Sequence, residues 1–336
     1  MRYILFPFAI LYGSITALRN ICFDLGLLKS HRFKTPTIVV GNLSVGGTGK
    51  TPQIEYLIRL LKHTKEVAVL SRGYRRKTKG YRLASQGDSA ETLGDEPYQY
   101  FRKFQDISVC VDSNRVRAIQ NLESDEKAPE VILLDDAFQH RKVCGGFNVV
   151  LTSYDKLFFK DFMLPTGDLR EMRSGAKRAH AIIVTKCPDS MSLSEQKEIE
   201  YKISSTYGKP VFFTKIAYRE EIKGPESISV DELKDYELVL ITGIAQPKPL
   251  LEFLKARDIL FEHLEFPDHH EFTEKDILKI EKQYDSLSSK RKLILTTEKD
   301  YVRIFAKLKN LHYIEIETVF IANEEKFKKL IIDYVG

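Results

Sequence analysis

Short apolar runs alternate with amphipathic stretches of helical length along most of the chain, a pattern typical of parallel strands joined by helices. Between residues 35 and 217 the pattern predicts strands bounded by polar or glycine-containing turns, with helices between them. The predicted strands are Thr37–Gly41, Glu66–Ser71, Ile107–Val111, Val131–Asp135, Phe147–Thr152 and Ala179–Thr185, and the predicted helices are Thr51–Lys62, Ser113–Asn121 and Leu193–Ser205.

A second series of alternating elements begins near Glu237. Its predicted strands are Leu238–Thr242, Lys292–Thr296 and Tyr313–Ile316, and its helices are Lys248–Lys255, Glu274–Tyr284 and Lys299–Lys307. The polar segment 218–229 separates the two series and is interpreted as a linker. We therefore expect an α/β protein with a mostly parallel sheet domain over residues 35–217 and a second, smaller α/β domain over residues 230–336.

Residues 1–34 have a different character. Tyr3–Leu18 carries no charge, and basic residues flank it with only Asp24 opposing them. This stretch is shorter than the roughly 20 apolar residues of a membrane span, and Pro7 interrupts it. Ile15, Leu18, Cys22 and Leu25 share one helical face, so we expect an amphipathic helix that associates with a membrane surface. A helix packed on its own domain and a true membrane span remain alternatives.

The composition is that of an ordinary globular protein. Hydrophobic residues make up 43% and charged residues 29% of the 336 residues, with a net charge of +5. This balance excludes a disordered chain and gives no reason to expect nucleic acid as a partner. The four cysteines lie far apart without a CxxC pair, which argues against a zinc site or a disulfide framework and fits a reducing compartment. A monomer is expected.

The strongest chemical signal is a glycine-rich loop between a β-branched strand and a helix. Ser44-Val45-Gly46-Gly47-Thr48-Gly49-Lys50-Thr51 is a P-loop in the context that this motif requires. Backbone N–H groups of the loop would bind phosphate oxygens, Lys50 would bridge the β- and γ-phosphates, and Thr51 would ligate Mg²⁺. Ser44 stands where the usual motif has its first glycine. Val45 stands where dimerising partition ATPases carry an additional lysine, which disfavours that class.

A second signal is the apolar strand Val131–Asp135, which ends in the carboxylates of Asp135 and Asp136. In open α/β sheets such residues reach the ligand-binding crevice, where one of them can hold Mg²⁺. Gln139 and His140 follow at once and could line the same crevice. The sequence thus predicts an ATP- or GTP-dependent enzyme with a magnesium site.

Two further clusters could supply an acid or base. Gly94-Asp95-Glu96-Pro97 places two carboxylates in a tight turn before a helix, where they could position and deprotonate an attacking hydroxyl. Phe266–Phe272 contains His269 and His270 beside acidic residues. Adjacent histidines seldom ligate one ion together, so this segment is either a loop or part of a site.

The order and spacing of these motifs resemble the tetraacyldisaccharide 4'-kinase family, the lipid A 4'-kinases of Gram-negative bacteria. The resemblance runs nearly end to end and rests on VGNLSVGGTGKTP (40–52), LSRGY (70–74), GDEP (94–97), LLDDAFQHR (133–141), LPTGDLRE (164–171), VTKC (184–187), TGIAQP (242–247), FPDHHEF (266–272) and TTEKDYVR (296–303). It implies transfer of the ATP γ-phosphoryl group to the 4'-hydroxyl of an acylated glucosamine disaccharide 1-phosphate. It also implies two lobes that close over an active-site cleft.

The same resemblance implies roles for individual residues. Asp95 matches a catalytic base and His269 its partner, whereas Thr51, Glu96, Asp135 and Asp136 match the Mg²⁺ and nucleotide environment without settling which carboxylate binds the metal. The expected acceptor-binding residues are Ser71, Arg72, Gly73, Tyr74, Gln139, His140, Arg170 and Glu171. ATP, Mg²⁺ and a bilayer-borne acceptor place the enzyme at the cytoplasmic face of the inner membrane.

Two other classes stay open on the residues alone. One is a P-loop GTPase or metallochaperone-type NTPase, because 184–189 reads Val-Thr-Lys-Cys-Pro-Asp near the position of the guanine-recognising NKxD motif. The other is a non-catalytic membrane scaffold, which the intact Lys50, Thr51, Asp95 and Asp135 disfavour.

Overall fold

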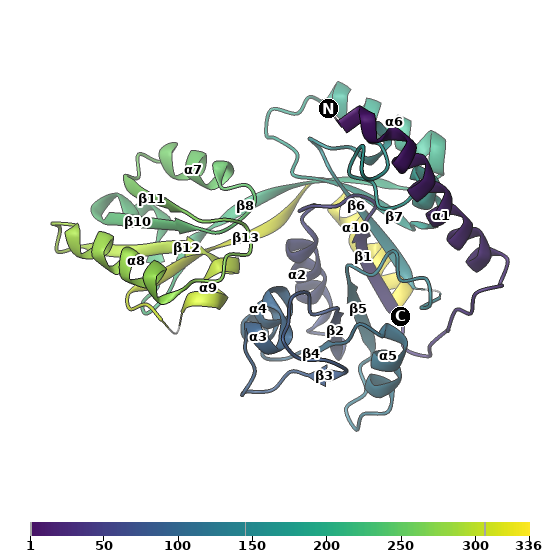
Figure 1. The fold of residues 1–336 in the computed structure, drawn as a ribbon, viewed down its shortest axis with the longest axis horizontal. Coiled ribbons are helices and arrows are strands. Elements are labelled where there is room, and N and C mark those ends of the chain that lie inside the picture. The colour runs from purple at the N-terminus through teal and green to yellow at the C-terminus, as the bar shows by residue number, and fades with distance from the viewer. Residues whose placement is uncertain (1, 145, 306) are drawn as a thin grey trace.

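The computed structural model describes residues 2–144, 146–305 and 307–336. Its strands form a single sheet in the order β11-β10-β12-β13-β8-β7-β6-β1-β5-β2-β4-β3, with β9 pairing β8. Figure 1 shows this sheet divided into two lobes, which β8 (Val211–Lys223) and β13 (Leu311–Ala322) connect. These two strands pair antiparallel along most of their length, so both lobes share one continuous hydrogen-bonded framework.

The first lobe has a parallel centre, as the apolar runs predict. Its parallel strands are β1 (Thr37–Asn42), β2 (Val67–Ser71), β4 (Ser108–Val111), β5 (Val131–Asp135), β6 (Phe147–Ser153) and β7 (Ala181–Thr185), with the short β3 (Arg82–Leu83) antiparallel at the edge. The observed ends lie within two residues of the predicted ones. Strands buried on both faces read as continuous apolar runs, which explains this agreement.

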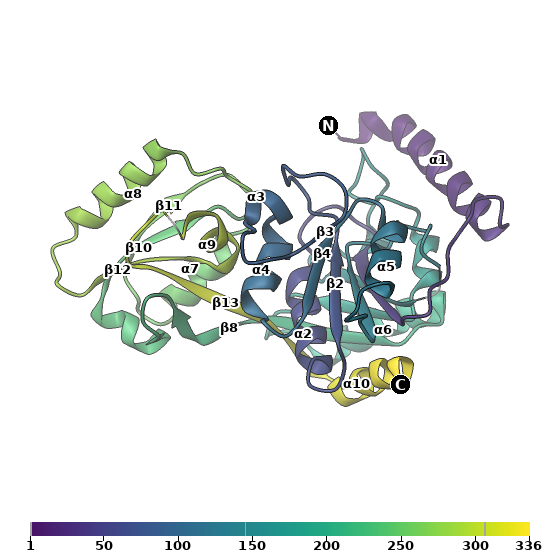
Figure 2. The ribbon, with the colours of Figure 1, turned by 90° about the horizontal axis from the view of Figure 1, so that it is seen from below.

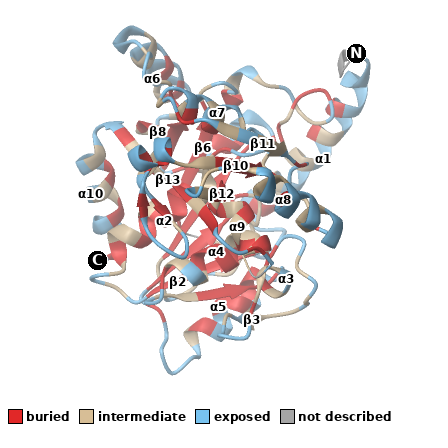
Figure 3. Cartoon of the chain, turned by 90° about the vertical axis from the view of Figure 1, so that its left-hand side faces the viewer, coloured by how far each residue is buried: buried red, intermediate tan, exposed pale blue. Residues whose placement is uncertain are grey.

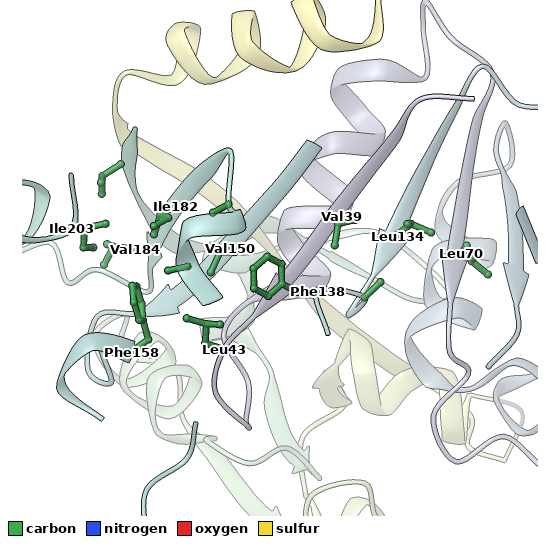
Figure 4. Packing of buried hydrophobic residues seen from close by; sticks show 14 of the residues in the cluster. Val39, Leu43, Leu70, Leu134, Phe138, Val150, Phe158, Ile182, Val184 and Ile203 are labelled. Carbon is green, nitrogen blue, oxygen red and sulfur yellow. The ribbon is translucent and has the colours of Figure 1, made fainter. Parts of the chain in front are cut away.

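Helices cover both faces of the first lobe. Alternate residues of β1 enter two separate cores: Val39 packs with α5 (Arg115–Glu123) and α6 (Leu193–Tyr207), whereas Ile38 packs with α2 (Lys50–Leu61) and α10 (Glu324–Val335). Figure 4 shows the first of these cores, in which Phe138 and Phe158 pack beside the aliphatic strand residues. Because helices cover both faces of the sheet, a site can form at the carboxyl ends of the parallel strands, where loops leave the sheet.

The second lobe is smaller and repeats the same plan. It contains β10 (Glu237–Thr242), β11 (Phe261–Glu265) and β12 (Lys292–Thr297), with α7 (Lys248–Lys255) on one face and α8 (Glu274–Ser286) and α9 (Glu298–Ile304) on the other. Figure 3 shows buried residues along the strands and exposed residues on the outer side of α8. The remaining elements are α3 (Ala90–Leu93), α4 (Asp95–Lys103), β9 (Ile228–Ser229) and the 3-10 helices η1 (Arg2–Leu5), η2 (Phe158–Lys160), η3 (Arg173–Arg178) and η4 (Val230–Asp235).

Two predicted boundaries need correction. The segment interpreted as a linker, 218–229, contains the second half of β8 and all of β9. Its charged side chains do not mark a loop, because they pair across the strands, as between Arg219 and Glu317 at 2.7 Å. The region 230–336 is not one domain either, since β13 returns the chain to the first lobe, where Phe327 and Ile331 of α10 are fully buried.

The N-terminal helix α1 (Phe6–Asp24) lies along the margin of the first lobe, on the side opposite α10 (Figure 2). Pro7 does not interrupt it, because proline is accepted in the first turn of a helix, where its missing N–H has no partner to lose. Within its 19 residues only Ala9, Gly13 and Phe23 are buried. The predicted apolar face is exposed, with Ile15 at 60% and Leu18 at 63%. With a mean hydropathy of 1.3, the helix meets the minimum length and composition for a membrane span.

Candidate active site

The P-loop connects β1 to α2 and is braced from two sides. Gly46 and Gly49 have φ values of +103° and +81°, in the left-handed region that glycine adopts without strain. The side chain of Asn42 donates to the Thr48 hydroxyl at 2.9 Å, and the Thr185 hydroxyl donates to the Thr48 carbonyl at 2.8 Å. The loop is therefore a preformed cradle at the N-terminus of α2, where backbone dipoles favour an anion.

The first half of the cradle is held by the segment that precedes Arg170. The Val45 N–H donates to the Asp168 carbonyl at 2.8 Å, and Ser44 forms a bridge with Leu169. Ser44 stands where the usual motif has its first glycine. It is buried and pairs with Leu169, so its side chain packs against the segment that supports the loop. The structure thus accommodates this departure from the common motif without opening the loop.

Two lysines lie at the phosphate cradle. The Nζ of Lys50 is 3.7 Å from Asp136, and the Nζ of Lys186 is 3.9 Å from the position that a Cβ on Gly47 would occupy. Lys186 is half-buried in a left-handed conformation with φ +57°, and burial together with the charge of Lys50 lowers its pKa. Across the described residues its ammonium group makes no hydrogen bond or ion pair, and the charge of Asp155 offsets the lowering of its pKa only in part. Two positive charges therefore lie next to the P-loop.

Two carboxylates, those of Asp135 and Asp136, lie at the end of β5. Asp135 is 5% exposed, and its Oδ2 accepts a hydrogen bond from Ser71 at 3.2 Å, whereas its Oδ1 is buried without a partner among the described residues. Burial and the charges of Asp136 and Glu96 raise the pKa of Asp135 to about 7. A cation would relieve both the unpaired oxygen and the repulsion between carboxylates.

These residues fit Mg²⁺. No group of three or more His, Cys, Asp or Glu side chains among the described residues forms a ready metal cage. Mg²⁺ does not require one, because it is commonly held by one or two carboxylates, substrate phosphates and water. Thr51 in the first turn of α2, together with Asp135, Asp136 and Glu96, offers that kind of partial coordination.

Asp136 is tied to Arg170, which was expected to contact the acceptor. The Arg170 guanidinium donates to both carboxylate oxygens, at 2.8 and 3.3 Å, and also to Asn42. Burial alone would raise the pKa of Asp136, but the charges of Lys50 and Arg170 outweigh it and lower the pKa. Arg170 therefore keeps Asp136 ionised and fixes its orientation beside the P-loop.

Gln139 and Glu171, also expected at the acceptor, lie in a buried network beneath α1. Gln139 donates from Nε2 to Glu171 at 2.8 Å and to the Asn42 carbonyl at 2.8 Å. The other Glu171 oxygen accepts from Asn20 of α1 at 3.1 Å and from Arg178. Because Glu171 is only 3% exposed and its oxygens are engaged, it anchors α1 to the site in this structure.

His140 differs from these two neighbours. Its Nε2 is buried and lacks a partner in the described part of the chain. Burial and the positive charge of Arg115 lower the pKa of His140 to about 4, so the ring stays neutral at physiological pH. A neutral, unpaired ring nitrogen is available to hydrogen-bond a ligand.

The loop after β2 packs closely against the turn that begins α4. Gly73 and Gly94 have φ values of +66° and +95°, and a Cβ on Gly73 would lie 2.8 Å from the Leu93 carbonyl oxygen. Any side chain at Gly73 would therefore push the two loops apart. Arg72 and Tyr74 of the same loop are exposed, and the Tyr74 ring lies edge-on to His269 with centroids 5.9 Å apart.

Asp95 and His269 meet across the two lobes. Asp95 begins α4 in the first lobe, His269 follows β11 in the second, and His269 Nδ1 lies 3.1 Å from Asp95 Oδ2. The proximity expected from the family resemblance is therefore present. Burial alone would raise the pKa of Asp95, but hydrogen bonds from His269 and Arg303 outweigh it and lower the pKa to about 2.

The paired histidines diverge instead of sharing a ligand. His270 lies 3.0 Å from Asp276 at the start of α8 and stacks on Phe266 with centroids 5.0 Å apart. His270 therefore contacts its own loop and the start of α8, whereas His269 contacts Asp95 of the first lobe.

Sequence reasoning missed several residues of this site. Asn42 and Thr185 brace the P-loop, Lys186 lies over it, and Lys299 and Arg303 contact His269. Lys186 and the last two belong to segments of the resemblance, 184–187 and 296–303, so their membership of a motif was the available signal. Their contacts depend on how distant segments meet and could not be read from spacing.

Comparisons with known proteins agree with this geometry. The family model described as tetraacyldisaccharide-1-P 4'-kinase matches residues 1–335. A curated tetraacyldisaccharide 4'-kinase of Flavobacterium johnsoniae is 52% identical, over 100% of this chain and 97% of its own length, and that of Bacteroides thetaiotaomicron is 41% identical over 98% and 92%. The crystal structure of LpxK from Aquifex aeolicus in complex with ATP is 32% identical, covers 100% of this chain and 99% of its own, and superposes with a TM-score of 0.80. These matches leave no room for a GTPase, a metallochaperone or a scaffold, and the chain belongs to the tetraacyldisaccharide-1-P 4'-kinase family.

Proposed function

We propose that this chain carries out the kinase reaction of its family with Asp95 as the group that receives the proton. The γ-phosphoryl group of ATP moves to the 4'-hydroxyl of a tetraacylated glucosamine disaccharide 1-phosphate. The assignment of Asp95 rests on its contact with His269 at 3.1 Å. The P-loop and the carboxylates at the end of β5 lie at the same edge of the first lobe.

The acceptor oxygen forms a bond to the γ-phosphorus, the bond from that phosphorus to the β–γ bridging oxygen breaks, and ADP leaves with the electron pair. The hydroxyl proton passes to Asp95. A carboxylate with a pKa near 2 is a weak base, but the transition state of phosphoryl transfer is loose and proton removal can come late. Position therefore counts for more than basicity, and His269 holds Asp95 in position.

Lys50 and Lys186 would contact the phosphates from two sides of the cradle. Thr51, Asp135, Asp136 and Glu96 would hold Mg²⁺, which neutralises charge on the phosphate oxygens when it is bound. The unpaired Asp135 oxygen and the unpaired Lys186 ammonium support this assignment, since each lacks a partner that an Mg²⁺–ATP complex would supply.

The acceptor carries acyl chains, so the enzyme must work at a bilayer. We assign this contact to the exposed apolar face of α1, supported by the basic residues that flank the helix. The enzyme would bind the inner membrane on its cytoplasmic face, where ATP is available. We propose that the chain acts there as a monomer. Arg72, Tyr74 and His140 would contact the acceptor directly, while Ser71, Gly73, Gln139, Arg170 and Glu171 support the site from behind.

A transfer assay tests this proposal. Radiolabelled ATP and tetraacyldisaccharide 1-phosphate in detergent micelles should yield a labelled lipid product. Asp95→Asn and His269→Ala should each lower kcat by about 10²-fold or more, the usual effect of losing an acid–base group. The double variant should be little worse than the poorer single variant if the two residues act as one unit. Fully additive losses would separate His269 from Asp95, and an active Asp95→Asn would remove the carboxylate from the mechanism.

A further inference from the structure

A third residue contacts the Asp95–His269 pair. Arg303, on α9 of the second lobe, donates to Asp95 Oδ2 and lies 2.9 Å from His269 Nδ1. Its guanidinium is also 3.4 Å from Asp300 of the same helix, and its side chain is 10% exposed. Asp300 is itself held by the Gly243 N–H at 2.8 Å and by the Thr297 hydroxyl at 2.8 Å. Arg303 therefore reaches Asp95 from a fixed support.

Two cationic side chains of α9 hold the His269 ring in place. Lys299 Nζ lies 3.2 Å from His269 Nε2 and is itself held by Asp268 at 2.9 Å. Ammonium and guanidinium groups only donate, so Lys299 at Nε2 and Arg303 at Nδ1 place a cation on each side of the ring. His269 Nδ1 also lies 3.1 Å from Asp95 Oδ2, the same oxygen to which Arg303 donates.

Asp95 is thus asymmetric. Oδ2 accepts from Arg303 and lies within hydrogen-bonding distance of His269, whereas no described residue donates a hydrogen bond to Oδ1. A carboxylate held on one oxygen by a guanidinium and an imidazole cannot rotate freely, so its second oxygen keeps a constant direction. That oxygen is the one left to accept the proton of the acceptor hydroxyl.

We propose that Arg303 is a positioning residue for phosphoryl transfer, which holds Asp95 through Oδ2 and leaves Oδ1 for the acceptor hydroxyl. The inference rests on the proposed role of Asp95. It adds that the second lobe holds the carboxylate through two side chains, so that the reactive geometry depends on the guanidinium of Arg303 as well as on the imidazole of His269. The planar fork of arginine reaches Asp95 and Asp300 together, and a lysine point charge would lose one of the two contacts.

The test compares Arg303→Ala, Arg303→Lys and Arg102→Ala in the transfer assay, with thermal unfolding measured for each. Arg102 is a matched control, because it is an exposed arginine at the same contact of α4 with α9 and lies over the Phe305 ring at 4.0 Å without touching Asp95. Arg303→Ala should lower kcat by about 10²-fold with both KM values within about threefold, since the loss is in the transition state and not in binding. Arg303→Lys should recover part of kcat, and Arg102→Ala should keep the kcat of the unsubstituted protein.

Chemical rescue separates positioning from folding. Methylguanidinium added to Arg303→Ala should restore at least about a tenth of the lost activity, and it should leave Arg102→Ala unchanged. The Asp95→Asn/Arg303→Ala variant should be no worse than Asp95→Asn alone. A kcat near that of the unsubstituted protein in Arg303→Ala overturns the inference. So does a loss that methylguanidinium does not relieve and that adds to the effect of Asp95→Asn. An active Asp95→Asn, by contrast, would refute the proposed role of Asp95 itself.

Discussion

Lys103 offers a direct test of how the two lobes are held together. Its Nζ lies 2.8 Å from Glu55, 2.8 Å from Glu298 and 3.4 Å from Glu315. Glu55 and Lys103 belong to helices of the first lobe, Glu298 begins α9 in the second, and Glu315 is on the shared strand β13. All three carboxylates are at most 8% exposed, and Lys103 contacts each of them at the junction. Glu55 also pairs with Arg59 and Glu315 with Lys223, whereas Glu298 has no other ion pair among the described residues.

Lys103→Met keeps most of the side-chain volume and removes the charge. Breaking a buried ion pair by removing one partner costs about 3 to 5 kcal/mol, because the partner that remains stays buried without its counter-charge. For 336 residues the entropy of unfolding is about 0.7 kcal/mol per degree, so the expected fall in Tm is about 4 to 7 °C. Lys62→Met is the control, because its ion pair with Asp106 at 2.9 Å is near the surface and is worth at most about 1 kcal/mol, or less than about 2 °C.

The pKa of Glu298 predicts how the loss of stability in Lys103→Met changes with pH. Burial and the charge of Glu55 raise the pKa of Glu298 to about 8, whereas Lys103 lowers it. The contribution of Glu298 to stability is therefore complete below its unfolded pKa near 4.5 and is lost as the pH rises toward 8. Without Lys103 the loss is larger, so the Tm deficit of Lys103→Met should be greatest at pH 8 and shrink toward pH 5.5. A deficit as small as that of Lys62→Met, or one that grows as the pH falls, would refute the reasoning.

Three further predictions concern the site and the membrane. Lys50→Ala should retain the Tm of the unsubstituted protein and lose turnover by at least about 10²-fold, because the lysine charge acts on the transferring phosphoryl group; normal turnover would remove the P-loop from the mechanism. Lys186→Met should weaken binding of a fluorescent ATP analogue by about tenfold, and Lys215→Met, whose ion pair with Asp189 faces solvent, should not; equal affinities would contradict a phosphate contact by Lys186. The pair Ile15→Ser and Leu18→Ser should lower binding to anionic vesicles by about tenfold or more, and Leu260→Ser, at 82% exposed, should not; unchanged vesicle binding would show that this face of α1 does not meet the bilayer.

The central elements could be predicted because their cause is local. Strands such as β1 and β5 are buried on both faces, so each is a continuous apolar run with a recognisable end. The P-loop and the β5 carboxylates follow directly from such ends. α7 (Lys248–Lys255) has the predicted bounds, because its apolar residues recur at helical spacing.

The connecting strands could not be predicted in the same way. The second half of β8 is half-buried and carries charges, and its stability comes from pairing with β13 rather than from burial. Lys223, for example, lies 3.1 Å from Glu315 on the opposite strand. A polar stretch of this kind has the composition of a linker, and only the cross-strand partner, about 90 residues away, explains its structure. The return of α10 to the first lobe follows from that pairing, since β13 carries the chain back.

The contact of α4 with α9 explains why Arg303 was missed and what it shares with Lys103. The two ends of α4 are Asp95 and Lys103, about 12 Å apart along the helix axis. Asp95 contacts Arg303 near the end of α9, whereas Lys103 contacts Glu298 at its beginning, so the helices run in opposite directions and are joined at both ends. One end contacts buried carboxylates at the junction between the lobes, and the other holds Asp95, the proposed acceptor of the proton. Since both ends belong to one short helix, loosening the Lys103 end should displace Arg303 as well. Lys103→Met should therefore lower kcat at temperatures where it is still folded, but methylguanidinium should not restore that loss, because the guanidinium is still present and only its support has moved.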